Sequence, residues 1–190
     1  MRVKIQPEFQ IQRINQLQDR ISKYREWTDK QLHTLPSEKS WSIMEVIEHM
    51  MIAQNVYEEK ITKKLNSREG KLVEASGISV SGVPSFLIKK FAPKEDKIRM
   101  KMKTSKIFDP RVNYHGDDTE KTFQEFDACL EKLKSWIELY RKEPISLKKF
   151  NSAIGAVVRF NAAEACEFIL AHNERHFFQI DKIAEVVKAM

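Results

Sequence analysis

The chain has 190 residues, of which 42% are hydrophobic and 32% charged, with only five glycines and six prolines. This length predicts a single domain over residues 1–190 with a core of its own, and the composition favours helix. The longest apolar stretch, residues 154–171, contains Arg159, Glu164 and Glu167 and is too polar to span a membrane. No hydrophobic segment of signal-peptide length occurs near the N-terminus, so we expect a cytoplasmic protein with no membrane partner.

The formal net charge of +6 is unevenly distributed along the chain. The segment from Lys89 to Lys106 holds eight basic residues against Glu95 and Asp96. Such a patch could attract phosphates or acidic metabolites, but no recognised nucleic-acid-binding module accompanies it. We therefore interpret the segment as a solvated loop and do not expect nucleic acid to be a partner.

Two cysteines, Cys129 and Cys166, lie far apart in the sequence and form neither a CxxC motif nor a disulfide framework. We expect both to be reduced and packed on helix faces.

The first expected helix starts near Pro7, since proline is tolerated at the first helical position, and residues 33–39 form a short connector after it. Its apolar residues recur at three- and four-residue steps, as Ile11, Ile14, Leu17, Ile21, Tyr24 and Trp27 or Thr28. Pro36 closes this segment. His33 lies near the helix end, where we expect it to face solvent or to interact with the last carbonyls.

The second expected helix opens at Ser42, and Glu45 three residues later completes a capping box. The buried stripe that follows consists of Val46, Met50, Ala53, Tyr57 and Ile61. His49 comes three residues after Val46, at the border of the buried face. The helix ends near Leu65.

Residues 71–117 lack a helical period and predict a crossover that packs over one end of the domain. We expect a short helix at Val83 to Phe91 and an extended segment at 97–103, where polar and apolar residues alternate. Asp109-Pro110 and residues 115–117 are turn sequences, which makes His115 a poor candidate for a metal ligand.

The third expected helix begins at Asp118 or Thr119, and the fourth begins at Asn161, with Glu164 completing a second capping box. The fourth helix carries one inward stripe, which consists of Ala165, Ile169, His172, His176, Ile180, Ile183 and Val187. Four amphipathic segments without a convincing sheet predict an all-α fold, a four-helix bundle.

His172 and His176 are four residues apart, so on a helix their rings lie on one face, roughly 6 Å from each other. Two such imidazoles can hold one metal ion, although a bare HxxxH is common by chance and a lone buried histidine is more often a satisfied core residue. His49 on the second helix offers a third imidazole. Three imidazoles on facing helices form the ligand set of a catalytic metal site, with water in the remaining position.

Two blocks of the sequence resemble the DinB-like (DinB/YfiT) family. Residues 41–49, WSIMEVIEH, are similar to the W-S-…-H opening of its second helix, and residues 172–180, HNERHFFQI, are similar to its H-x-x-x-H-x-x-Q-I signature. A less specific similarity covers residues 108–110 and 150–164. The family implies a four-helix bundle in up-down-down-up order with a long crossover after the second helix.

The resemblance also implies a three-histidine site for a divalent metal ion, often nickel or zinc, with His49, His172 and His176 as the ligands. This chain departs from the family at Phe177-Phe178, where many relatives have a second histidine and Arg-Gly. Gln179 could orient a ligand or a bound water, or it could be an ordinary surface glutamine. Glu45 could accept a proton near the metal, but its capping role competes for the same side chain.

A divalent ion held by three neutral imidazoles can lower the pKa of a bound water or thiol. Relatives include thiol S-transferases that use bacillithiol or mycothiol, mycothiol-dependent isomerases and metal-dependent hydrolases. The first hypothesis is therefore a metal-dependent transferase or hydrolase that acts on a small molecule with a low-molecular-weight thiol or water. The alternatives are a non-catalytic metal-binding bundle, acting as a stress-response or dimerisation module, and a DNA-binding protein that uses Lys89 to Lys106. Many relatives pair as dimers, so a homodimer is one possible state.

Overall fold

A computed structural model describes residues 2–93, 104–114, 118–155 and 157–190. The helices in these ranges are α1 (Pro7–Ser22), α2 (Asp29–His33), α3 (Ile43–Leu65), α4 (Gly82–Phe91), α5 (Pro110–Asn113), α6 (Thr119–Lys142) and α7 (Ala162–Lys188). The strands form three antiparallel pairs, β1 (Val3–Lys4) with β3 (Ser79–Val80), β2 (Leu72–Val73) with β4 (Ile145–Ser146), and β5 (Phe150–Asn151) with β6 (Arg159–Phe160). The chain is mostly helical, which confirms the expected all-α class.

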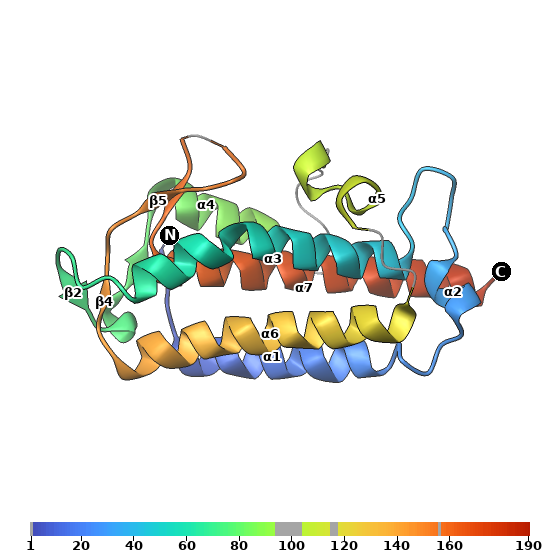
Figure 1. The fold of residues 1–190 in the computed structure, drawn as a ribbon, viewed down its shortest axis with the longest axis horizontal. Coiled ribbons are helices and arrows are strands. Elements are labelled where there is room, and N and C mark those ends of the chain that lie inside the picture. Colours follow the sequence, from blue (N-terminus) through green and yellow to red (C-terminus); the bar gives the residue numbers. More distant parts are fainter. Residues whose placement is uncertain (1, 94–103, 115–117, 156) are drawn as a thin grey trace.

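Four long helices, α1, α3, α6 and α7, lie side by side along the long axis of the molecule (Figure 1). Both α1 and α3 pack against α6 and α7. The colour gradients in Figure 1 show that α1 and α7 run in one direction and that α3 and α6 run in the other. The connection from α3 to α6 therefore carries the chain back along the length of the molecule, and it contains α4 and α5.

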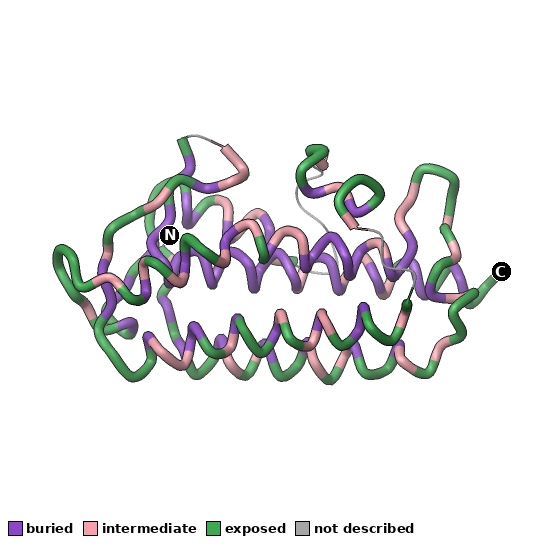
Figure 2. The backbone as a smooth tube through the Cα atoms, in the orientation of Figure 1, coloured by how far each residue is buried: buried purple, intermediate pink, exposed green. Residues whose placement is uncertain are grey.

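The first half of α7 is enclosed by the rest of the molecule. Every residue from Phe160 to Asn173 is buried, whereas a surface helix buries only one stripe. Helices α3, α1 and α4 all pack against α7, and Figure 2 shows the buried colour running along both α3 and α7. Small residues make this possible, because the alanines among residues 162–171 let neighbouring helices approach closely.

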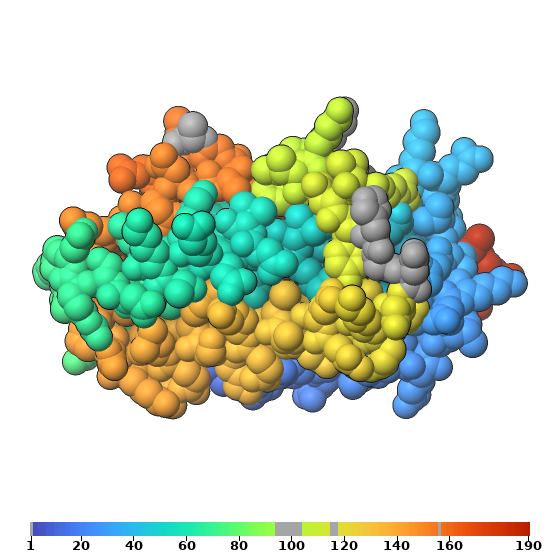
Figure 3. Space-filling model, viewed as in Figure 1, coloured from blue at the N-terminus to red at the C-terminus, as the bar shows by residue number. Residues whose placement is uncertain are grey.

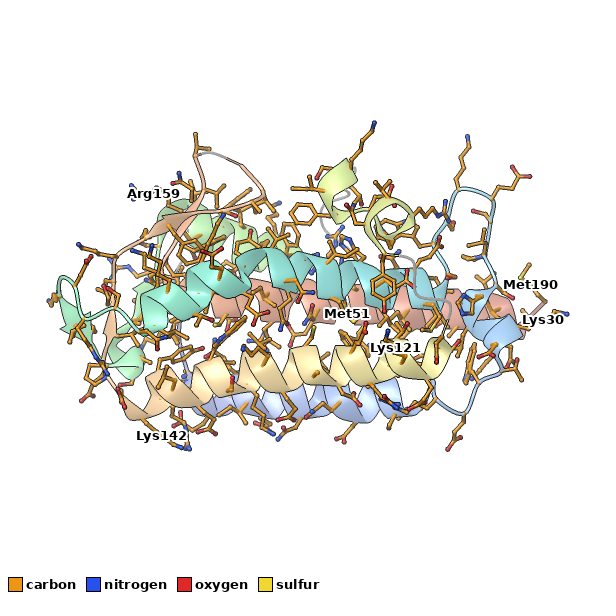
Figure 4. The ribbon with its side chains drawn as sticks, in the orientation of Figure 1. Lys30, Met51, Lys121, Lys142, Arg159 and Met190 are labelled. Atoms are coloured by element: carbon orange, nitrogen blue, oxygen red, sulfur yellow. The ribbon has the colours of Figure 1, made fainter. Side chains whose placement is uncertain are left out.

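Apolar side chains fill the space that the ribbon drawing leaves open between the helices. Met51, only 3% exposed, lies between α3 and α6 (Figure 4), and in the space-filling view the side chains of these two helices are in contact along the face shown (Figure 3). Leu17 of α1 and Leu133 of α6 are buried in the same core. No helix in the described part of the chain has both the length and the apolar character needed to cross a bilayer.

A buried polar network fixes α7 against α1. Arg13 donates to the carboxylates of Glu167, at 2.7 Å, and Glu174, at 2.6 Å. Gln10 donates to Glu167 at 2.7 Å and accepts from the Tyr140 hydroxyl, also at 2.7 Å. Because every member has partners, the network sets the rotation of α7 without leaving a buried charge uncompensated.

Most of the expected helix boundaries are confirmed. Ser42 and Asn161 cap α3 and α7, each in a complete capping box, and Asp118 caps α6. The short helix expected at Val83 to Phe91 is α4, and Cys129 and Cys166 are free thiols.

The first helix differs from the expectation. It ends at Ser22 instead of continuing to the connector near His33, and α2 begins after Thr28, whose side chain forms its own capping box with Gln31. The three strand pairs were also not predicted, because two-residue strands carry no period. The extended segment expected at 97–103 and the turn at His115 lie outside the described residues.

We predict that Asn161→Ala destabilises the protein by about 1 kcal/mol. The substitution removes the side chain that accepts from the Glu164 backbone N–H at 2.9 Å and leaves that buried donor unpaired. Thermal unfolding should show a decrease in Tm of about 2–4 °C. Ser81→Ala is the matched control, because Ser81 precedes α4 without making a side-chain capping bond, and its Tm should stay at the wild-type value.

Candidate metal centre

Three histidines converge in the interior between α3 and α7. His49 lies in the second turn of α3, and His172 and His176 lie one turn apart on the face of α7 that packs against α3. The Nε2 atom of His172 is 3.2 Å from Nε2 of His49 and 3.1 Å from Nε2 of His176. All three rings are buried, with exposures of 6%, 8% and 7% in chain order. The structure therefore brings together the three residues that the sequence singled out.

In His49 and His176 the ring nitrogen that does not contact the other histidines, Nδ1, lies within hydrogen-bonding distance of an oxygen acceptor. His49 Nδ1 lies 2.7 Å from the backbone carbonyl of Phe108, and His176 Nδ1 lies 3.0 Å from Oε1 of Gln179. A carbonyl oxygen only accepts hydrogen bonds, so Nδ1 carries the proton in both rings. In the neutral form their Nε2 atoms are then unprotonated and present lone pairs to the common point.

With these tautomers, the three Nε2 atoms have one proton too few to form a hydrogen bond in every contact between them. His172 Nε2 contacts both other Nε2 atoms, yet a neutral His172 has at most one proton to donate from this nitrogen. At least one buried lone pair therefore faces another nitrogen without a hydrogen between them. A buried acceptor without a partner destabilises a fold by about 1–3 kcal/mol, whereas one cation at this point would satisfy all three nitrogens at once.

Protonating the cluster does not resolve this conflict. Burial lowers the pKa of all three histidines, and for His172 and His176 the pKa falls well below its ordinary value. The positive charges of neighbouring histidines and of Arg175 act in the same direction. For His49 the bond to Phe108 and the charge of Asp109 oppose burial but do not outweigh it. The lowered pKa values favour the neutral imidazole, the form that binds a metal ion.

The donor set fits a divalent transition metal. At a metal–nitrogen distance of about 2.0–2.1 Å, tetrahedral coordination separates ligand nitrogens by about 3.3 Å, close to the 3.1 and 3.2 Å found here. Imidazole nitrogen suits zinc, nickel and copper better than it suits calcium or magnesium. Among the described residues no fourth histidine, cysteine or carboxylate joins the group. Three protein donors leave coordination positions for water or substrate.

Aromatic side chains pack against the cluster, and two cavities border it, of which one is lined by all three histidines. The ring of Trp41 packs on His49 with the centroids 4.8 Å apart, and Phe91 of α4 packs on His172 at 5.9 Å. The cavity has a volume of about 420 Å³ and is lined by the three histidines together with side chains of α3, α4 and α7. Its size is within the range of small-molecule sites in proteins.

The structure shows what Gln179 and Glu45, the two other candidate site residues, contact. Gln179 contacts His176 through its Nδ1 and so orients a proposed ligand. Glu45 is occupied elsewhere, because it completes the capping box with Ser42 and forms an ion pair with Arg111. Burial would raise the pKa of Glu45, but the bonds from Arg111 and Ser42 lower it below its usual value. Glu45 is therefore a structural anion in this fold.

The phenylalanines that distinguish this chain point away from the cluster. Phe177 is fully buried and packs against Phe126 of α6 at 6.0 Å, and Arg20 of α1 lies over its ring. The ring of Phe178 is contacted by Lys182. His33 is exposed at the end of α2, with Nε2 3.2 Å from the Thr119 hydroxyl.

Sequence reasoning missed Arg175 and the Phe108 carbonyl. Arg175 lines the cavity beside His176, and its position three residues after His172 on an inward face was an available signal. The Phe108 carbonyl gave no signal, because any residue has one and only the path of the crossover brings this one to His49.

A scan of the sequence against models of protein families finds no match, and searches among curated proteins and among solved structures find none either.

We predict that the metal-free protein loses stability as the pH falls below about 6.5. A histidine whose pKa is lowered in the fold contributes stability that is present above its unfolded pKa and lost as the pH decreases towards the folded value. Glu48 acts in the opposite sense, since burial and the nearby Glu45 raise its pKa to about 7. Below about pH 6.5 the unfolded chain therefore binds up to two protons more than the folded protein, three at the histidines less one at Glu48. The free energy of unfolding then falls by at most about 2.7 kcal/mol per pH unit.

Denaturant titrations of chelator-treated protein between pH 8 and 5 measure this slope. The double variant His172→Asn/His176→Asn should remove most of it. An equal slope in the double variant and the wild type would show that the buried imidazoles are not its source.

Proposed function

We propose that the chain is a DinB-like four-helix bundle, in up-down-down-up order with a long crossover between α3 and α6. We propose further that His49, His172 and His176 hold one divalent metal ion, nickel or zinc, and that the protein is a metal-dependent transferase or hydrolase acting on a small molecule. The observation that carries the proposal is the meeting of three buried Nε2 atoms with too few protons to satisfy them.

Hydrogen bonds within the protein orient two of the three proposed ligands without a metal ion. The Phe108 carbonyl holds the tautomer and orientation of His49, and Gln179 does the same for His176. Outer hydrogen bonds of this kind typically govern metal affinity by about 10–100-fold. When bound, a divalent ion supplies positive charge that lowers the pKa of a coordinated water or thiol.

A catalytic role is supported by the cavity and by the number of donors. A structural zinc site is closed by four protein ligands, whereas only three such groups meet in the described part of the chain. The cavity of about 420 Å³ begins at these three side chains, so a small molecule bound in it would lie against the ion. A non-catalytic metal-binding bundle would need neither feature.

The nucleophile is expected to come from outside the chain. Cys166 is fully buried and burial strongly raises its pKa, and Cys129 has its pKa raised to about 11 by burial and the charges of Glu58 and Glu125. Neither cysteine lines the cavity, and Tyr57, which does, has its pKa raised by burial. The reacting group is therefore a water or a low-molecular-weight thiol.

We predict that protein purified without an affinity tag contains about one nickel or zinc ion per chain. His49→Ala, His172→Ala and His176→Ala should each lose most of this metal, because two imidazoles remain of three. Gln179→Leu should weaken binding by about 10–100-fold without abolishing it. Elemental analysis by mass spectrometry measures the metal content directly.

His33→Ala is the matched control for these variants, because His33 is an exposed histidine on α2 outside the cluster. It should keep the wild-type metal content. Full metal retention by all three alanine variants would refute the site.

A cobalt-substituted protein distinguishes the thiol from the water reaction. If a thiol cosubstrate is used, 2-mercaptoethanol should produce a sulfur-to-cobalt charge-transfer band in the near ultraviolet, because imidazole and water ligands produce none. The band should be absent in His172→Ala. A cobalt spectrum that does not respond to thiol would leave hydrolysis as the reaction.

A further inference from the structure

Arg175, in the cavity wall, has no carboxylate partner among the described residues, unlike six other arginines of the chain. Arg175 lines the cavity next to His176, and its guanidinium lies over the ring of Phe91 at 5.5 Å. Its Nη1 atom is buried and has no hydrogen-bond partner among the described residues. By contrast, six other arginines form ion pairs with carboxylates, namely Arg13, Arg20, Arg25, Arg68, Arg111 and Arg141.

The position of Arg175 is unfavourable for its positive charge. Burial lowers the pKa of Arg175, which means that the charged form is less well solvated than in water. Arg175 lines the same cavity as the three histidines, so its positive charge lies near any cation that they hold. A half-buried positive charge that has no carboxylate partner among the described residues and lies beside a proposed cation site would be stabilised by an anion.

The remaining wall of the cavity shows the character of that partner. None of the described residues that line the cavity is acidic, so none of them neutralises Arg175 from inside. The rings of Phe91, Phe108 and Phe168 and the side chain of Ile169 form an apolar surface. A ligand that complements this wall combines an apolar body with a negatively charged group.

We propose that the cavity binds an organic carboxylate, whose carboxylate group pairs with Arg175 and whose apolar body lies along the Phe91 and Phe168 rings. The planar guanidinium matches a carboxylate in a two-pronged hydrogen bond, and a single unpaired cation calls for a monoanion. This inference rests on the proposed function in one respect: it names the class of small molecule that is bound next to the metal ion. The binding itself requires only the cavity and Arg175.

Calorimetric titration with octanoate and with octanamide tests the proposal. The two probes share an apolar chain and differ in charge, and the first titrations use metal-free protein in the presence of a chelator, so that binding to a metal ion cannot contribute. Octanoate should bind at least about 10-fold more tightly than octanamide, as expected for a buried charge-assisted hydrogen bond. Equal affinities, or no binding of either probe, would overturn the proposal.

Variants assign the effect to one side chain. Arg175→Gln should weaken octanoate binding to the octanamide level and leave octanamide binding unchanged. Arg175→Lys keeps the charge but loses the two-pronged geometry, so its octanoate affinity should lie between those of the wild type and Arg175→Gln. Arg141→Gln is the charge-matched control, because Arg141 is exposed on α6 and pairs with Glu138 within its own helix; it should bind octanoate like the wild type. Wild-type octanoate affinity in Arg175→Gln would overturn the assignment.

Two further measurements separate this inference from the metal proposal. The Tm of metal-free Arg175→Gln should equal or exceed that of the wild type, since the substitution removes a half-buried charge that has no carboxylate partner among the described residues. Its metal content should also be retained, because Arg175 is not one of the three donors. If the histidine variants keep their metal but octanoate binding still depends on Arg175, the anion site stands without the metal function. If the metal is lost from those variants but octanoate and octanamide bind alike, only the anion site fails.

Discussion

The meeting of three imidazole nitrogens at one buried point is the constraint on which the rest of this structure depends. The outer nitrogens of His49 and His176 donate to the Phe108 carbonyl and to Gln179, so their inner nitrogens have only lone pairs to offer. His172 stands between them with at most one proton for two contacts. Burial lowers the pKa of His172 and His176 and so disfavours their protonated forms. A bound cation would give all three Nε2 atoms a partner. The hydrogen bonds of Nδ1 in His49 and His176 hold these rings in the orientation that such binding requires.

The fold provides this convergence through the position of α7. Its first half is covered by α3, α1 and α4, so its side chains have little freedom to rearrange. The bonds from Arg13 to Glu167 and Glu174 hold one face of the helix against α1. His172 lies five residues after Glu167, about 140° around the helix, which directs it away from α1 and towards α3. The capping box at Asn161 defines where the helix begins, and so the same polar contacts that stabilise α7 also set the register of its histidines.

Charge in the cavity is distributed in a way that stability alone does not explain. Buried carboxylates on the α1 side of α7 are paired with Arg13, whereas Arg175 on the cavity side has no carboxylate among the described residues. An ion at the three histidines would add further positive charge within the same apolar walls. The site would thus have an excess of positive charge that an anion could balance. This excess connects the proposed metal ion with the proposed carboxylate ligand.

The sequence by itself determined the elements and the candidate ligands, because both follow from local rules. Capping residues and apolar periods placed α3, α6 and α7 almost to the residue, and four-residue spacing put His172 beside His176. The break after Ser22 and the two-residue strands were not predicted, since they depend on a competing cap and on pairing between distant segments. Only the tertiary structure decided that His49 reaches the pair on α7 and that the Phe108 carbonyl fixes its tautomer. It also decided that Arg175 lies beside a cavity without a carboxylate partner among the described residues. The physical reason is that proton counts and charge balance depend on which groups are brought within hydrogen-bonding distance, and these groups are separated by many residues along the chain.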